Sequence, residues 1–191
     1  VDLDLGERLA KLAERDPEFR LSDFSSRVEL IFKELQAAWS ERDWGRARPF
    51  VSDSLFETQS YWMESFKEQG LRNVIEHPVV NAVQPASVMS DAYFDAVTVR
   101  VVASCIDYMV TDDGRHLSGS ETRPRRFTEY WTFIRGAQRK GPAGRELKCP
   151  NCGAPLKINQ AGHCEYCQAK VTTGEFDWVL SRIEQDEAYG G

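Results

Sequence analysis

Four cysteines near the end of the chain constrain its fold more than any other feature. They form two Cys-x-x-Cys pairs separated by eleven residues: Cys149, Cys152, Cys164 and Cys167. Pro150 and Gly153 suit a tight turn in the first pair, because proline fixes φ and glycine accepts a positive φ. Two such knuckles facing each other surround one ion with four thiolates. The spacing therefore predicts a tetrahedral zinc site.

Other uses of these cysteines stay open. Two disulfides would suit a small secreted domain, but no signal-peptide pattern is present. Iron also accepts four thiolates, and His163 beside Cys164 could replace one of them. A redox Cys-x-x-Cys usually stands alone beside a βαβ pattern, which is missing here. A closed four-thiolate site leaves no position for substrate, so we expect one structural Zn²⁺.

Composition excludes several classes of protein. The chain has 191 residues, 41% hydrophobic and 28% charged, with a net charge of −6. These values are typical of a globular protein and do not favour a general nucleic-acid binder, which shows a basic face. No stretch approaches the roughly 18 apolar residues of a membrane-spanning helix. Cys105 stands among apolar and β-branched neighbours, which indicates a buried and unreactive thiol.

Helical periodicity marks the first seventy residues. Leucines among charges predict a short amphipathic helix within 1–16. The strongest periodic segment follows at about 23–42, with Asp23 as the expected N-cap. A helical turn is expected at 46–50. A further helix is expected at 53–69, before Gly70.

From residue 71 the period changes to two, which predicts strands. The expected strands are 74–76, 79–89, 92–110, 127–136 and 176–184, with a polar excursion at 112–126 and a linker at 136–144. Helices followed by a run of strands predict an α+β fold, with the helices packed on one face of a bent antiparallel sheet.

The cysteine pairs lie between the last two expected strands. We therefore divide the chain into an amphipathic N-terminal helix, an α+β domain and an inserted zinc ribbon: 1–16, then 17–144 with 174–186, and 145–173. The ends of the insertion must lie close together, because the two strands have to remain paired.

Several short motifs, weak singly, share an order and spacing. They are Asp16-Pro17-x-Phe19 with Phe24, the helix containing Phe32 and Gln36-Ala37-Ala38-Trp39, Arg42-Asp43-Trp44, Val97-Thr98-Val99-Arg100, Glu129-Tyr130-Trp131-Thr132-Phe133-Ile134-Arg135 and Trp178-Val179-Leu180-Ser181-Arg182-Ile183. Together they resemble the Tim44-like family over about 16–140 and 175–184. The namesake domain is the C-terminal domain of the mitochondrial inner-membrane import-motor scaffold, and the family has bacterial members.

The resemblance implies a cone-shaped fold similar to that of nuclear transport factor 2, in which helices wrap a bent sheet around a pocket. It further implies a non-enzymatic, membrane-associated scaffold or binding domain. The expected partners are a protein, membrane lipid or both, and no nucleic acid. The expected place is the cytoplasmic face of a bacterial membrane, with any anchor upstream of Val1. The cysteine module is not part of the eukaryotic domain, so we expect it to have a local role.

Apolar side chains are expected to line the pocket and to bind a lipid tail or a peptide segment. The candidates are Trp39, Phe56, Trp62, Phe66, Val99, Val101, Trp131 and Phe133, each of which could equally be ordinary core. The ribbon is expected to contact proteins, and residues 145–173 carry four basic side chains against two acidic ones. Its candidate contact residues are Lys148, Lys157, Tyr166 and Lys170.

Two alternatives belong to other classes of function. Related folds host isomerases and dehydratases, which would need an acid or base in the pocket and a hydroxyl donor. The candidates are Asp107, Glu129 and His77, with Tyr108 or Tyr130 as the donor. A nucleic-acid module built on the ribbon would use exposed Tyr166 and the lysines, although the net charge opposes it.

Overall fold

The structure is a computed structural model and describes residues 4–190. Helices come first: α1 (Leu5–Arg15), α2 (Leu21–Ser40), the 3₁₀ helix η1 (Trp44–Phe50) and α3 (Asp53–Glu68). Four strands follow: β1 (Leu71–Ser90), β2 (Phe94–Thr111), β3 (His116–Gly136) and β4 (Val179–Gln185). Leu3, which was expected in the first helix, lies outside the described residues. The order confirms the predicted α+β class.

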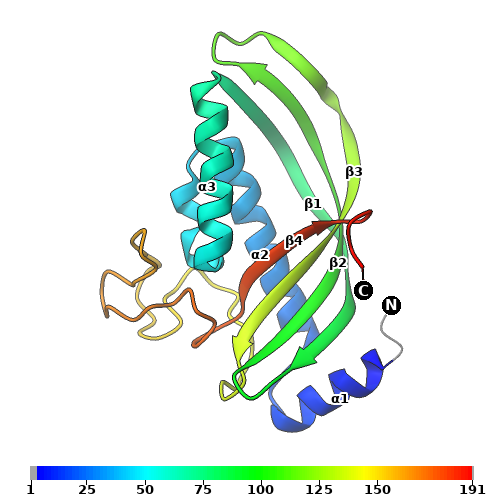
Figure 1. The fold of residues 1–191 in the computed structure, drawn as a ribbon, viewed down its shortest axis with the longest axis vertical. Helices are drawn as coiled ribbons and strands as arrows, with labels where there is room; N and C mark the ends of the chain where they lie inside the picture. Colours follow the sequence, from blue (N-terminus) through cyan, green and yellow to red (C-terminus); the bar gives the residue numbers. More distant parts are fainter. Residues whose placement is uncertain (1–3, 191) are drawn as a thin grey trace.

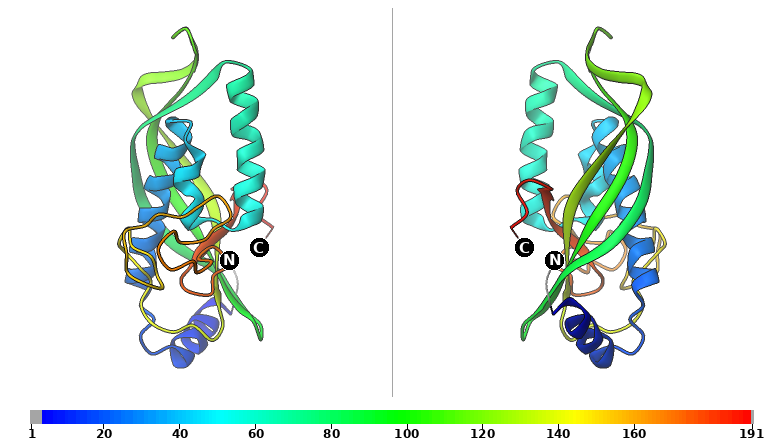
Figure 2. Two further views of the ribbon diagram at one scale, coloured as in Figure 1. Left: turned by 90° about the vertical axis from the view of Figure 1, so that its left-hand side faces the viewer. Right: turned by 90° about the vertical axis from the view of Figure 1, so that its right-hand side faces the viewer.

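The strands form one antiparallel sheet in the order β1-β2-β3-β4. The sheet is long and bent, and α2 and α3 lie on the same side of it (Figures 1 and 2). Residues 145–173, called the cysteine module below, lie between β3 and β4 and are placed near the lower end of α2 (Figure 1). Among residues 4–190, no helix combines the length and apolar character that crossing a membrane requires.

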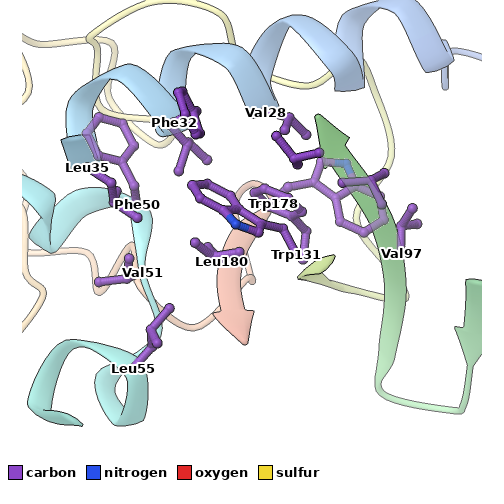
Figure 3. Close-up of a cluster of buried hydrophobic side chains, with 14 of the residues drawn as sticks. Val28, Phe32, Leu35, Phe50, Val51, Leu55, Val97, Trp131, Trp178 and Leu180 are labelled. Atoms are coloured by element: carbon purple, nitrogen blue, oxygen red, sulfur yellow. The ribbon is translucent and has the colours of Figure 1, made fainter. Parts of the chain in front are cut away.

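The core fills the space between α2 and the concave face of the sheet. Side chains from α2, η1, β2, β3 and the β4 region meet there (Figure 3). The ring of Phe24 packs edge-on against Phe133 and Trp178, with centroids 5.4 and 5.2 Å away. Such aromatic pairs add about 0.5–1.5 kcal/mol each beyond the burial of their area. The inward positions of β2 are those that alternation predicted: Val97, Val99, Val101, Ala103 and Cys105 are all buried.

The edge strand β1 corrects one expectation. Two strands were predicted on either side of His77-Pro78, but β1 runs through both residues. His77 takes a positive φ of 50°, and the pairing with β2 shifts register between Glu76 and Val79. A bulge at an edge tolerates proline, because no second neighbour needs its missing N–H.

The expected polar excursion at 112–126 is also wrong over most of its length. Strand β3 begins at His116, and its polar first half pairs with β2 as far as Arg125 and Arg126. This ribbon extends beyond the core, so its side chains show no alternation of burial. Gly119 holds a positive φ of 84° there, and a Cβ would collide with the backbone of Asp107.

Element ends differ slightly from the predictions. Helix α2 begins at Leu21 with Arg20 as its N-cap, so Asp23 lies in the first turn and not at the cap. There its charge still complements the helix dipole. Strand β4 begins at Val179 and not at residue 176. Gly70 ends α3 with the predicted positive φ, which is 63°.

A buried ion pair fastens the segment after α1 to the end of β3. Arg135 Nη2 lies 2.8 Å from Asp16 Oδ2, and both residues are almost fully buried. The Gly141 N–H donates to the same carboxylate, and the Arg135 guanidinium lies 4.6 Å from the ring centre of Trp178. Removing one member of such a pair leaves a buried charge without compensation.

We therefore predict that Asp16→Ala lowers the free energy of unfolding by about 3–5 kcal/mol, the cost of an uncompensated buried charge. Chemical denaturation of the purified variant measures this. Glu14→Ala is the matched control, because Glu14 is exposed on α1, and it should change stability by less than about 0.5 kcal/mol. Equal effects of the two substitutions would contradict the role of the buried pair.

Candidate functional site

The four cysteines of the module meet at one point. Their sulfur atoms all lie within 4.8 Å of one another, and the structure contains no disulfide among them. The Sγ atoms of Cys149 and Cys167 are 3.8 Å apart, and those of Cys152 and Cys164 are 4.0 Å apart. Four thiolates about 2.3 Å from a tetrahedral ion stand roughly 3.8 Å from one another. The cluster can therefore hold a metal ion.

The two Cys-x-x-Cys knuckles have the same backbone geometry. Gly153 donates its N–H to the carbonyl of Cys149 at 2.9 Å, with φ at 73°. Gln168 donates to Cys164 at 2.9 Å with φ at 64°, so a non-glycine residue fills the second left-handed position. His163 is not part of the cluster, because its backbone pairs with Lys170 and its N–H donates to Asn159.

Hydrogen bonds lower the pKa of one of these thiols, and burial raises the pKa of another. The side chain of Asn151 and the backbone of Ala169 lower the pKa of Cys167 to about 6. Burial raises the pKa of Cys149 to about 11. The buried thiol gains most from a bound cation, because a thiolate is disfavoured there until a positive charge offsets its desolvation.

An arginine of α2 holds together the two ends of the module. Arg27 Nη1 lies 3.2 Å from Asp177 Oδ2 and donates to the carbonyl of Gly144 at 3.1 Å. The same Asp177 oxygen accepts the N–H of Gly144 at 2.8 Å. Arg27 Nε also donates to the Trp178 carbonyl at 2.8 Å. The chain thus leaves and re-enters the α+β fold at one place, as the insertion requires.

A second polar contact joins the far side of the module to the start of α3. The Asp53 carboxylate pairs with buried Arg48 and with Lys170, and it accepts the hydroxyl of Thr172. Arg48 Nε donates to the Gln160 carbonyl at 2.6 Å. Burial raises the pKa of Asp53, but its bonds with Lys170, Arg48 and Thr172 outweigh this effect and lower the pKa to about 2. Lys170 was expected to face a partner, but it faces this domain.

A separate cavity of about 340 Å³ lies between α2, η1 and α3 and the inner face of the sheet. Its apolar wall is formed by Leu35, Trp39, Trp44, Ile75, Phe127, Trp131 and Ile183. Its polar lining is formed by Gln36, Gln59, Asn73, Asp107, Arg125, Glu129 and Gln185. Buried Cys105 also reaches it. A half-apolar hollow with converging polar groups is the usual form of a small-ligand site.

Of the eight expected pocket residues, two line the cavity and six lie elsewhere in the fold. Trp39 and Trp131 line the cavity. Phe56 stacks on Trp44, and Phe66 packs edge-on against Trp39, so both lie behind lining residues. The others are in the core or at the surface: Val99, Val101 and Phe133 are buried, and Trp62 is 53% exposed.

Sequence reasoning missed Trp44, Phe127 and Ile183 as wall residues. Trp44 was cited only within the motif Arg42-Asp43-Trp44 and not as a pocket residue. Phe127 and Ile183 occupy inward positions of strands, where alternation predicts burial but not which buried residues border a space.

The polar lining forms two small networks. Asp107 Oδ1 accepts the side-chain amide of Asn73 at 2.7 Å, and Asp107 Oδ2 lies 2.9 Å from Arg125 Nη1. Glu129 accepts the indole N–H of Trp131 at 2.9 Å and the amide of Gln185 at 3.1 Å.

The remaining catalytic candidates of the sequence lie elsewhere. His77 is exposed on β1. Tyr108 stacks on His116. Tyr130 stacks on Tyr189, 3.8 Å away, and alternation turns it away from inward-facing Trp131. None of these three lines the cavity, so the structure does not place a hydroxyl donor beside Asp107 or Glu129 from this set.

A larger hollow of about 630 Å³ lies where the module meets α2 and η1. Its cations already have anionic partners within the chain: Arg27 with Asp177, Arg145 with Asp23, and Lys148 with Glu146. The basic residues of this hollow would suit an anion only if they had no acidic partners. The smaller cavity is therefore the better candidate for a ligand site.

The fold and the two sites define a class: an α+β domain that encloses a ligand-sized cavity and carries a four-cysteine module. The family model described as Tim44-like domain matches residues 5–143. The chain belongs to this family. The match ends just before the cysteine module, and it omits β4, which completes the sheet. Comparison with curated proteins finds no match.

We predict that Cys152→Ser releases the metal and unfolds the cysteine module, because metal binding is the main source of folding energy in so small a unit. The α+β fold should persist, since its core is a separate cluster of side chains. Metal analysis and a thermal melt followed by circular dichroism measure both effects. Cys105→Ala is the control and should keep the metal. Loss of all structure in Cys152→Ser, or retention of its metal, would contradict the account.

Proposed function

We propose that this chain is a non-enzymatic scaffold or binding domain that works at a membrane. Its family generally mediates protein or membrane interactions and is generally non-catalytic. The observation that carries the proposal is the cavity, which has an apolar wall, a polar rim and a volume suited to a small ligand. The proposed location is the cytoplasmic face of a bacterial membrane.

The cavity would receive a lipid tail or a side chain of a peptide segment. Trp39, Trp44 and Trp131 supply rigid apolar surface from two helical segments and one strand. The indole N–H groups are already satisfied, since Trp39 donates to Asn73 and Trp44 to the Phe56 carbonyl. Trp44 and Trp131 are largely covered by the protein itself, so half-buried Trp39 offers the most apolar surface for a guest to cover, and this contact stabilises the guest by excluding water.

The cysteine module would hold one structural Zn²⁺ and serve protein contacts. Four thiolates with this spacing suit zinc and close the coordination sphere. The two attachments at Arg27 and Asp53 hold the module against the domain. Tyr166 is 54% exposed and Lys157 is exposed, so these two side chains remain available to a partner.

Catalysis in the cavity is the second candidate, and the observation that favours it is the pair of carboxylates, Asp107 and Glu129, in its lining. A pocket acid or base of this kind works with a strongly raised pKa. Carboxyl titration by NMR separates the two functions. A carboxyl pKa raised by several units in that experiment would favour an enzyme.

Native mass spectrometry of protein purified without added metal, followed by lipid extraction, tests the proposal directly. We expect one zinc ion and a co-purified lipid. Zinc without any lipid would favour a peptide or protein ligand for the cavity. Absence of zinc would contradict the structural role of the module.

We further predict that Gln36→Trp lowers ligand occupancy about tenfold, because the added indole fills space that the guest needs, and tenfold corresponds to only about 1.4 kcal/mol. Gln36 lines the cavity from α2. Gln138→Trp is the matched control, since Gln138 is exposed in the loop after β3 and should leave occupancy unchanged. Equal occupancy in both variants would show that the ligand binds elsewhere.

A further inference from the structure

The lining of the cavity combines two kinds of group that both attract a positive charge. Three indoles and one phenyl ring contribute aromatic faces, which carry negative electrostatic potential. The carboxylates of Asp107, from β2, and Glu129, from β3, border the same space. Arg125 is the one cation in the lining, so the acidic groups there outnumber it.

Arg125 shows that this rim already holds a cation. Its guanidinium pairs with Asp107 at 2.9 Å and lies 6.0 Å from the ring centre of Phe127. The side chain is nevertheless 65% exposed. Exposed ion pairs contribute little to stability, so a competing cation from solution can displace the guanidinium at little cost.

Glu129 is the carboxylate left without a charge partner. Its two oxygens accept hydrogen bonds from Trp131 and Gln185, which are both neutral donors. Within residues 4–190, no lysine, arginine or histidine forms an ion pair with it. The side chain is half-buried beside Trp131, so a cation placed there would be partly shielded from water and would interact more strongly than at the surface.

The thiol of Cys105 reports the combined field of the two acids. Burial, Asp107 and Glu129 together raise the pKa of Cys105 to about 11, against the opposing effect of Arg125. Both carboxylates therefore act on the same small volume, although they come from different strands. A negative field beside aromatic faces favours a cation over an anion or a neutral guest.

We propose that the cavity is a binding site for an organic cation, namely an ammonium group on a short apolar chain. The ammonium lies between Glu129 and the Asp107 side of the rim, and the hydrocarbon packs against the apolar wall at half-buried Trp39 and Phe127. This inference rests on the proposed function, since it names the chemistry of the ligand that the cavity receives. A free amine or a lysine side chain of a partner protein would supply the same group.

Isothermal titration calorimetry with three probes of equal chain length tests the charge preference. The probes are hexylammonium, hexanol and hexanoate at neutral pH and low salt. We expect hexylammonium to bind about tenfold more tightly than hexanol, as one partly desolvated cation–π or charge contact would give. Hexanoate should bind most weakly of the three.

Two substitutions at the rim should act in opposite directions. Glu129→Gln keeps an acceptor for the Trp131 indole, and it should reduce hexylammonium affinity to that of hexanol without changing hexanol binding. Arg125→Ala removes the competing guanidinium and should tighten hexylammonium binding severalfold. Glu57→Gln makes the same chemical change on the exposed face of α3 and should have no effect. If Glu129→Gln does not fold, Asp107→Asn takes its place.

The outcomes separate this inference from the proposed function. Equal binding of hexylammonium and hexanol, or no effect of Glu129→Gln, would overturn the cation site and leave the apolar cavity intact. Binding of none of the probes would overturn both. The source of the cation follows from a fourth probe, Nα-acetyl-lysine methylamide. Binding as tight as that of hexylammonium supports the site with a protein side chain as its guest, and clearly weaker binding supports it with a free amine.

Discussion

The rest of the structure depends on one buried contact, the pairing of Arg27 with Asp177. Asp177 accepts the N–H of Gly144 and the guanidinium of Arg27, so the entry and exit of the cysteine module are held at the same point of α2. A Cβ on residue 144 would lie too close to the Asp177 carboxylate, which explains the glycine. Because both ends are fixed there, β4 can continue the sheet beside β3 although more than forty residues of chain intervene. The charges are buried, and breaking such a pair costs more than an exposed one contributes.

Because both ends of the module are held at Arg27, the cysteine module and the cavity occupy separate parts of the fold. The module is attached at Arg27 and at Asp53, and its cysteine cluster has a small apolar core of its own. The cavity lies on the other side of η1, between the helices and the polar end of the sheet, and no cysteine of the module lines it. The family match, which stops before the module, covers most of the cavity wall. The α+β fold therefore carries the module without losing its cavity, because the two sites are built from separate residues.

The sequence was sufficient where a local pattern strongly favours one arrangement. The two Cys-x-x-Cys pairs favoured one shared centre, and the structure brings all four sulfur atoms together without a disulfide. The 3.6-residue period of α2 and the alternation of β2 likewise place their buried faces correctly. Prediction failed where the structure depends on tertiary contacts, because local sequence signals do not carry that information. The polar start of β3 has no buried face, so only its pairing with β2 makes it a strand. Which residues line the cavity depends on where gaps remain between packed elements, and sequence periodicity does not show this. Val99, expected in the wall, lies in the core, and Trp44, not expected there, lines the cavity.

The five tryptophans allow the central claim, that the cavity is the functional site, to be measured directly. Trp39, Trp44 and Trp131 line it, whereas Trp62 is half-exposed on α3 and Trp178 lies in the core. Their indole N–H groups give separate signals in a ¹H–¹⁵N NMR spectrum, which can be followed while the co-purified ligand or hexylammonium is titrated. The account predicts that the three lining signals shift together with one affinity and that those of Trp62 and Trp178 stay in place. A shift of Trp62 alone, or no shift of the three lining signals, would contradict it.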